Sequence, residues 1–364
     1  MPQSRPGVGS VLPVANRVAR IGGFTAVLVG LSICVIVQQA AMGPATRHPV
    51  RGPAALKRTA QPAVRSARRG SVTALERGVR AVVLRQRGTM VRKAFGVQRL
   101  SPPEVSLTRV DGTRGWAFGG SVITPPAGVT ALPETSLFIA VRARGRWEVC
   151  LAGTPDFTRL VREAPATVVR TDERPFLERF GDAKASGHDA TADLSLPWRT
   201  GQSWTLQPVA GNGGLRFSGG DGRVLAPAPG RLYRLCSKAP DRALLLLVHS
   251  TGLASVYYQV THTATVPDGT LVRRGTYLGM TGTDQPCGGA PAGGPAVVRF
   301  ALLNAGRTLP VDGARLGGWA VHATSSQVWA DRAGLRIDAG NPLLNFGTGA
   351  ATASPVPLPS TPPG

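Results

Sequence analysis

The sequence is poor in acidic residues and in histidine. Its 364 residues include 20 Asp and Glu against 42 Lys and Arg, and five His. Zinc-dependent hydrolysis and general acid–base catalysis require clustered histidines and carboxylates, and no such cluster of suitable spacing is present in the sequence. The segment 71–166 also lacks paired carboxylates, a nucleophile elbow and a phosphate-binding glycine loop. We therefore expect that segment to be a spacer or a binding module.

Negative charge is too scarce to balance the positive charge, which leaves a formal net charge of +22. An excess of this size favours polyanionic partners, namely nucleic acid, anionic lipid or acidic wall polymers. Much of it is local, because 14 Lys and Arg lie between Arg47 and Arg99 against the single acid Glu76. The chain shows no nucleic-acid recognition motif, so nucleic acid is not expected as a partner.

One long run lacks charge altogether. Residues 21–42 are uncharged and follow the basic segment 1–20. At about 1.5 Å per residue, a helix of this length can cross a bilayer of about 30 Å. The run predicts a transmembrane anchor or the hydrophobic region of a signal peptide; it lacks a clean cleavage site, yet the basic residues after it keep cleavage open. Either alternative places the rest of the chain outside the cytoplasm, as a membrane-anchored or secreted protein.

Composition divides the remainder into four parts. Residues 43–70 mix Pro, Ala and Arg without apolar periodicity and predict a basic linker. Residues 71–166 predict a small α+β module, and residues 194–345 predict a β domain of short strands punctuated by Gly and Pro. The Pro-, Ser- and Thr-rich tail 346–364 predicts disorder.

Local signals place several elements within the first module. Helical spacing of apolar residues and a terminal glycine predict a helix from Ser71 to Gly88 that packs on a sheet. Strand patterns follow, with a hairpin around Gly145. Thr154 as a cap and Pro155 in the first turn predict a closing helix.

Three glycine-rich blocks of the β domain are patterned beyond their composition: DGRVLAPAPGRLYRL, LLLLVHSTGLASVYYQV and VPDGTLVRRGTYLGMTG. Their glycines suit tight turns that need positive φ. In this order the blocks resemble the lysostaphin/LytM/β-lytic family of zinc metallopeptidases, which cut peptide bridges in bacterial peptidoglycan. The resemblance runs from about Leu196 to Phe300, and the flanking LPWRTGQSW and GGWAVH are similar to secreted, actinobacterial-type members. It implies a mainly β fold class, with a C-terminal antiparallel β-sheet domain preceded by the small α+β module.

The family's functional residues are replaced in this chain. The resemblance puts a zinc-binding Asp at Arg216 and a zinc-binding His at Arg299, while the two catalytic histidines fall on Gln259 and Val297. Arginine stays protonated and offers only donors, so two guanidiniums repel a Zn²⁺ ion rather than hold it. The resemblance therefore implies a degenerate member that lacks the metal ligands and the zinc cofactor of active members.

Three functional hypotheses remain open. A groove could bind carboxylate-bearing wall peptides through bidentate arginine pairs, unless its arginines are plain surface charge. The candidate groove residues are Arg216, Tyr257, Tyr258, Gln259 and Arg299. Alternatively, the chain regulates a wall hydrolase by docking onto it, as degenerate members of this family do. The third hypothesis is an active zinc peptidoglycan endopeptidase with relocated ligands, for which His188 and Asp193 are candidates. The expected partners are peptidoglycan or an anionic wall polymer, a wall hydrolase, and the membrane through residues 21–42.

Three of the four cysteines lie after the apolar run. Cys236 and Cys287 flank the central strands of the family-like domain, and in an oxidising compartment we expect them to form a disulfide. Cys150 is left over and is expected to be a small buried apolar residue. His249 matches a strand-end histidine of the family that is not a zinc ligand.

Overall fold

The computed structural model describes residues 62–182, 187–208, 214–290 and 294–348, all of which belong to one unit of the chain. The predicted basic segment and apolar run at 1–42 and most of the predicted tail lie outside these residues. Among the described helices, none combines the length and the apolar character needed to cross a bilayer.

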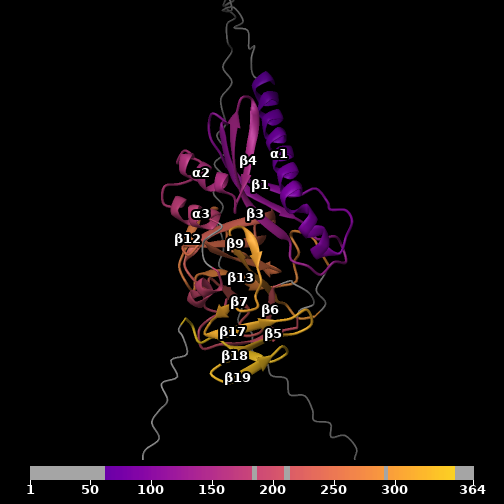
Figure 1. Ribbon diagram of the computed structural model, residues 1–364, viewed down its shortest axis with the longest axis vertical. Coiled ribbons are helices and arrows are strands. Elements are labelled where there is room, and N and C mark those ends of the chain that lie inside the picture. Colours follow the sequence, from indigo (N-terminus) through magenta and orange to yellow (C-terminus); the bar gives the residue numbers. More distant parts are fainter. Residues whose placement is uncertain (1–61, 183–186, 209–213, 291–293, 349–364) are drawn as a thin grey trace, which may run out of the picture. The chain divides into compact units, whose positions relative to one another are not determined.

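The N-terminal module begins with a long helix that lies along a four-stranded antiparallel sheet (Figure 1). The helix is α1 (Pro62–Phe95), and the strand order is β1 (Glu104–Val110), β2 (Trp116–Ile123), β3 (Glu134–Ala143) and β4 (Arg146–Leu151). Leu75, Val79 and Val83 share one face of α1 and are buried against this sheet, as their spacing predicts.

Helix α1 is longer at both ends than the sequence predicts. It begins within the predicted linker and passes through Gly88. Glycine inside a helix costs about 1 kcal/mol, but Val91 and Phe95 continue the buried apolar face beyond it. The helix ends instead at Phe95. The next residue, Gly96, has a φ of +68°, and the N–H groups of Gly96 and Val97 donate back to carbonyls of the last turn.

Three short helices follow the four-stranded sheet along the chain. They are α2 (Pro155–Glu163), α3 (Arg174–Gly181) and the 3-10 helix η1 (His188–Asp193). The Thr154 hydroxyl accepts the Phe157 N–H at 3.3 Å and so caps α2, and β3 and β4 form the hairpin at Gly145, both as predicted.

The β domain is built on a nine-stranded antiparallel sheet, which we call the large sheet. Its path is β12 (Thr270–Val272), β8 (Gly230–Ala239), β9 (Arg242–His249), β10 (Leu253–Tyr258), β14 (Val298–Asn304), β6 (Leu215–Ser218), β5 (Ser203–Gln207) and β20 (Pro342–Leu344), with β15 (Arg307–Leu309) paired to β14.

Two smaller sheets complete the domain. One contains β11 (Val260–Thr261), β13 (Tyr277–Thr281) and β7 (Arg223–Leu225); the other contains β16 (Arg315–Leu316), β17 (Trp319–Ala323), β18 (Val328–Arg332) and β19 (Leu335–Asp338). The fold is therefore mainly β, as predicted. The first and third glycine-rich blocks each divide their two strands between the large sheet and the three-stranded one.

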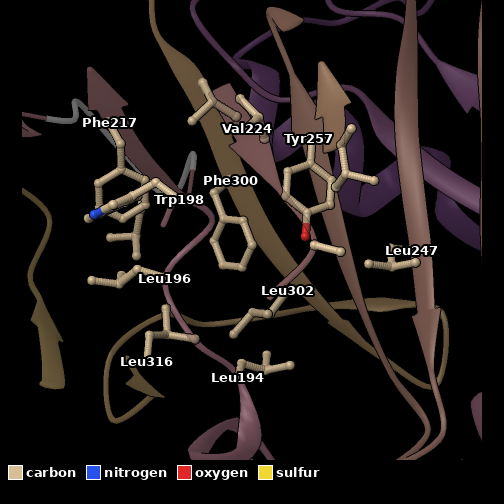
Figure 2. Packing of buried hydrophobic residues seen from close by; sticks show 14 of the residues in the cluster. Leu194, Leu196, Trp198, Phe217, Val224, Leu247, Tyr257, Phe300, Leu302 and Leu316 are labelled. Atoms are coloured by element: carbon tan, nitrogen blue, oxygen red, sulfur yellow. The ribbon is translucent and has the colours of Figure 1, made fainter. Parts of the chain in front are cut away.

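Both faces of the large sheet are buried. One face packs on the smaller sheets through an aromatic core that includes Trp198, Phe217 and Phe300 (Figure 2). The other face packs on the N-terminal module, where Phe118 and Ile139 share a core with residues of β8, β9 and β10. The module and the β domain therefore pack together through a shared hydrophobic core and are not separately folded domains.

The predicted disulfide is present. Cys236 and Cys287 are bonded, with their Cα atoms 5.4 Å apart. Cys150 is free and buried, as predicted, and burial raises the pKa of its thiol to about 11.

Candidate functional site

A polar row crosses the large sheet at the positions where the family resemblance puts its active site. In the strand register Gln207 lies opposite Arg216, Arg216 opposite Arg299, and Arg299 opposite Tyr258. The side chains of directly paired residues share one face of a sheet. Arg216 and Arg299 are therefore neighbours on adjacent strands.

Arg299 is deeply buried within this row. The residue is 4% exposed, and its Nη1 donates a hydrogen bond to the carbonyl oxygen of Ala131 at 3.0 Å. Burial and the neighbouring positive charge of Arg216 together lower the pKa of Arg299 to about 10, against an opposing contribution from Tyr258. The guanidinium therefore remains charged at neutral pH.

The partner of Arg299 lies in the loop between β2 and β3, residues 124–133, which belongs to the N-terminal module. This loop also contacts the segment that contains Cys287, because the Ala290 N–H donates to the Val129 carbonyl at 3.0 Å. The Tyr258 hydroxyl donates to the carbonyl of Gly288 in the same segment, which the disulfide ties to β8. Arg299 thus faces the module's loop, and not an open cleft.

The two positions where the resemblance expects catalytic histidines hold no group that can transfer a proton. Gln259 is 1% exposed and has a left-handed φ of +63°, and its Oε1 accepts no hydrogen bond among the described residues. Val297 is fully buried and is held by paired backbone hydrogen bonds of 3.0 Å to Gly282. An amide and an isopropyl group cannot act as general acid or base.

The structure brings together only part of the predicted groove. Arg216, Arg299 and Tyr258 share the row, and Gln259 follows Tyr258 directly. Tyr257 points to the other face, where its ring lies 5.5 Å from that of Phe300 in the aromatic core (Figure 2). Its placement in the groove was wrong, because successive side chains of a strand alternate between faces.

The residues present do not fit a zinc ion. Two guanidiniums that carry only N–H donors lie at the positions where the resemblance expects zinc ligands, and they repel each other. The residues described here contain no group of three or more His, Cys, Asp or Glu placed to hold a metal. His188, a candidate for a relocated site, is half-buried, and its Nε2 contacts the Pro310 carbonyl at 2.8 Å.

His249 has a structural environment. It is 1% exposed, with Nδ1 3.0 Å from the Pro229 carbonyl and Nε2 2.9 Å from the Ser255 hydroxyl. Burial lowers its pKa to about 4, opposed by the bond to Pro229 and aided by Arg274. The imidazole is therefore neutral at physiological pH.

An ionic cluster that no sequence pattern indicates joins the module to the large sheet. Glu173 is fully buried just before α3. Its carboxylate accepts hydrogen bonds from both terminal nitrogens of Arg109 in β1, at 2.5 and 2.6 Å. The Tyr233 hydroxyl of β8 donates to the same carboxylate. No local pattern marks these residues, since their three segments meet only in the folded chain.

The basic segment between Arg47 and Arg99 is also not uniformly available to partners. Arg87, one of its members, is 4% exposed. Its Nη2 donates to the carbonyls of Ala152, at 3.2 Å, and of Gly306, at 3.1 Å. This arginine bridges the module and the β14–β15 turn.

Neither a protein-family model nor a curated protein matches this chain significantly. Solved structures are similar to parts of it. An M23 metalloprotease described as pseudoalterin from the deep sea is 24% identical, covering 42% of this chain and 97% of its own, with a TM-score of 0.36. The catalytic domain of the antimicrobial peptidase lysostaphin from Staphylococcus simulans is 17% identical, covering 35% and 95%, with a TM-score of 0.22. A zinc-containing peptidase from Vibrio cholerae is 17% identical, covering 55% and 58%, with a TM-score of 0.25.

Proposed function

We propose that this chain is a non-catalytic, extracytoplasmic protein associated with the bacterial cell wall, a pseudopeptidase that regulates a wall hydrolase. The observation that carries the proposal is the direct pairing of Arg216 with Arg299 at the two positions where the family resemblance expects zinc ligands. Two protonated guanidiniums cannot hold a cation between them, so these positions cannot bind the zinc ion that peptide hydrolysis in this family requires.

The covered face favours regulation over direct binding of wall peptides in the groove. Tyr258, Gln259 and Arg299 are each at most 4% exposed, and the loop 124–133 contacts this row. A stem peptide would have to displace that loop and break the bond between Arg299 and Ala131. Contacts with a wall hydrolase or with anionic wall polymer are therefore assigned to the outer surface of the protein.

The test combines metal content with two activity assays on the full chain. We expect no stoichiometric zinc after incubation with Zn²⁺ and desalting, and no digestion of purified peptidoglycan. We also expect the full chain to change the rate at which an active zinc hydrolase of this family digests the same substrate. Stoichiometric zinc with turnover refutes the pseudopeptidase; an unchanged rate of the added hydrolase refutes the regulatory role.

A single substitution separates the regulatory role from groove binding. Arg216 is only half-buried, and Arg216→Gln removes its charge while retaining a polar side chain. If the groove is closed, this variant sediments with purified peptidoglycan as the unchanged chain does. Arg315→Gln, an exposed arginine on β16, serves as the matched control for the loss of one charge. A loss of sedimentation confined to Arg216→Gln means that the groove itself binds the wall.

A further inference from the structure

A cavity of about 400 Å³ lies in the β domain, away from the arginine row. Arg199, Arg223 and Arg274 contribute to its lining from three separate segments of the chain. The lining residues Trp198 and Ala226 belong to the aromatic core, on the face of the large sheet opposite to Arg299. This basic pocket is therefore distinct from the family-like site and shares no residue with it.

Two of the three guanidiniums are held in place by the protein. Arg274 donates to the Thr348 hydroxyl at 2.6 Å and to the Asp193 carbonyl at 2.8 Å. The guanidinium carbon of Arg223 lies 5.1 Å from the centre of the Tyr277 ring, a cation–π contact. Preorganised cations lose less entropy when a ligand binds than freely rotating side chains do.

The charge of the pocket is not balanced within its walls. Asp221 is the one acidic residue among the described residues of the lining, and its carboxylate accepts the backbone N–H of Arg223 at 3.0 Å. Arg199 is exposed and forms no ion pair among the described residues. Three guanidiniums against one carboxylate leave a formal charge of +2 around the cavity. A concave surface of one sign concentrates the field and raises the local concentration of counter-ions.

Space and surface chemistry point to a ligand larger than a simple ion. The volume falls in the range of roughly 300–1,000 Å³ that is typical of small-molecule sites. Leu225 and Ala226 provide apolar wall, and Tyr277 provides an aromatic edge. The hydroxyl of Thr200 adds a polar group that can serve as donor or acceptor.

We infer that the basic pocket binds a dianionic ligand that carries a phosphate monoester or two carboxylates on a small polar body, whether a free molecule or the end of an anionic polymer. The planar fork of arginine matches both oxyanions with two parallel hydrogen bonds. Two negative charges neutralise the +2 of the lining, and the apolar wall accommodates the body of the ligand. The inference does not depend on the proposed function, because neither Arg216 nor Arg299 takes part.

Calorimetric titration of the full chain at pH 7 tests it with three probes: glucose 6-phosphate and malate, which are both dianions, and neutral glucose. We expect saturable one-to-one binding of at least one anion, weaker at higher salt, and none of neutral glucose. The stronger of the two anions identifies the preferred oxyanion. A comparison of oligomeric with monomeric glycerol phosphate then distinguishes the two sources of the ligand. A site for the end of a polymer binds the oligomer more tightly than monomeric glycerol phosphate.

The variants separate this pocket from general surface charge. Arg199→Ala and Arg223→Ala should each weaken anion binding about tenfold, the effect of losing one charge-assisted hydrogen bond. Arg315→Ala removes the same charge outside the pocket and should bind as the unchanged chain does. Since Arg199 has no ion pair to lose, its variant should also unfold at the unchanged temperature. Absence of saturable binding by both anions, or equal weakening by Arg315→Ala, overturns the inference.

Discussion

Replacement of Glu173 by Gln will remove a large part of the protein's stability. The Glu173 carboxylate is fully buried and receives a bidentate pair from Arg109, the Tyr233 hydroxyl and, at 3.3 Å, the Arg170 N–H. Glutamine preserves the shape of the side chain but removes its negative charge. Its NH₂ group then faces one of the hydrogen-bond donors that the carboxylate accepted from. Arg109, with a side chain that is 14% exposed, is then left without its counter-ion.

The expected loss is about 3–5 kcal/mol of unfolding free energy, the cost of breaking a buried ion pair from one side. Urea unfolding, followed by both fluorescence and circular dichroism, measures it. Glu148→Gln is the matched control: Glu148 is 49% exposed and lies 3.5 Å from Arg159, so its loss should cost less than about 1 kcal/mol.

A double variant tests the cause. Arg109→Met with Glu173→Met removes both charges together, and we expect it to be more stable than Glu173→Gln alone, because no uncompensated buried charge is left. A loss below 1 kcal/mol for Glu173→Gln refutes the argument. So does a double variant that is less stable than the single one, since the cost would then come from packing and not from charge.

Two further predictions concern stability. The pKa of His249 is lowered by burial from 6.5 to about 4, so between these pH values the unfolded chain binds a proton that the folded chain does not. Stability should therefore fall by up to about 3 kcal/mol as the pH decreases through this window. His249→Gln should flatten that dependence in urea unfolding at pH 7 and pH 4.5; an unchanged slope contradicts the assigned pKa. Loss of the disulfide in Cys236→Ser with Cys287→Ser, whose partners are 51 residues apart, should cost about 4 kcal/mol in the chain-entropy model. Thermal unfolding checks this, and a midpoint equal to that of the unchanged chain contradicts it.

Local features were predictable from the sequence alone. The Thr154 cap and the hairpin at Gly145 depend on interactions between residues a few positions apart, which the chain order specifies. The assignment of Arg216 and Arg299 to the family's ligand positions stays a prediction; the strand register shows that the two residues are directly paired. The end of α1 was not predictable in this way. The burial of Val91 and Phe95 against the sheet outweighs the free-energy cost of placing Gly88 inside the helix.

The tertiary structure alone decided the environment of the candidate site. Alternation along a strand separates Tyr257 from Tyr258, but it does not say which face carries the site when both faces of the sheet are buried. The cover over Arg299 comes from residue Ala131, 168 positions away along the chain. Contacts across such distances depend on how the module packs on the large sheet, and local sequence patterns carry no record of that packing.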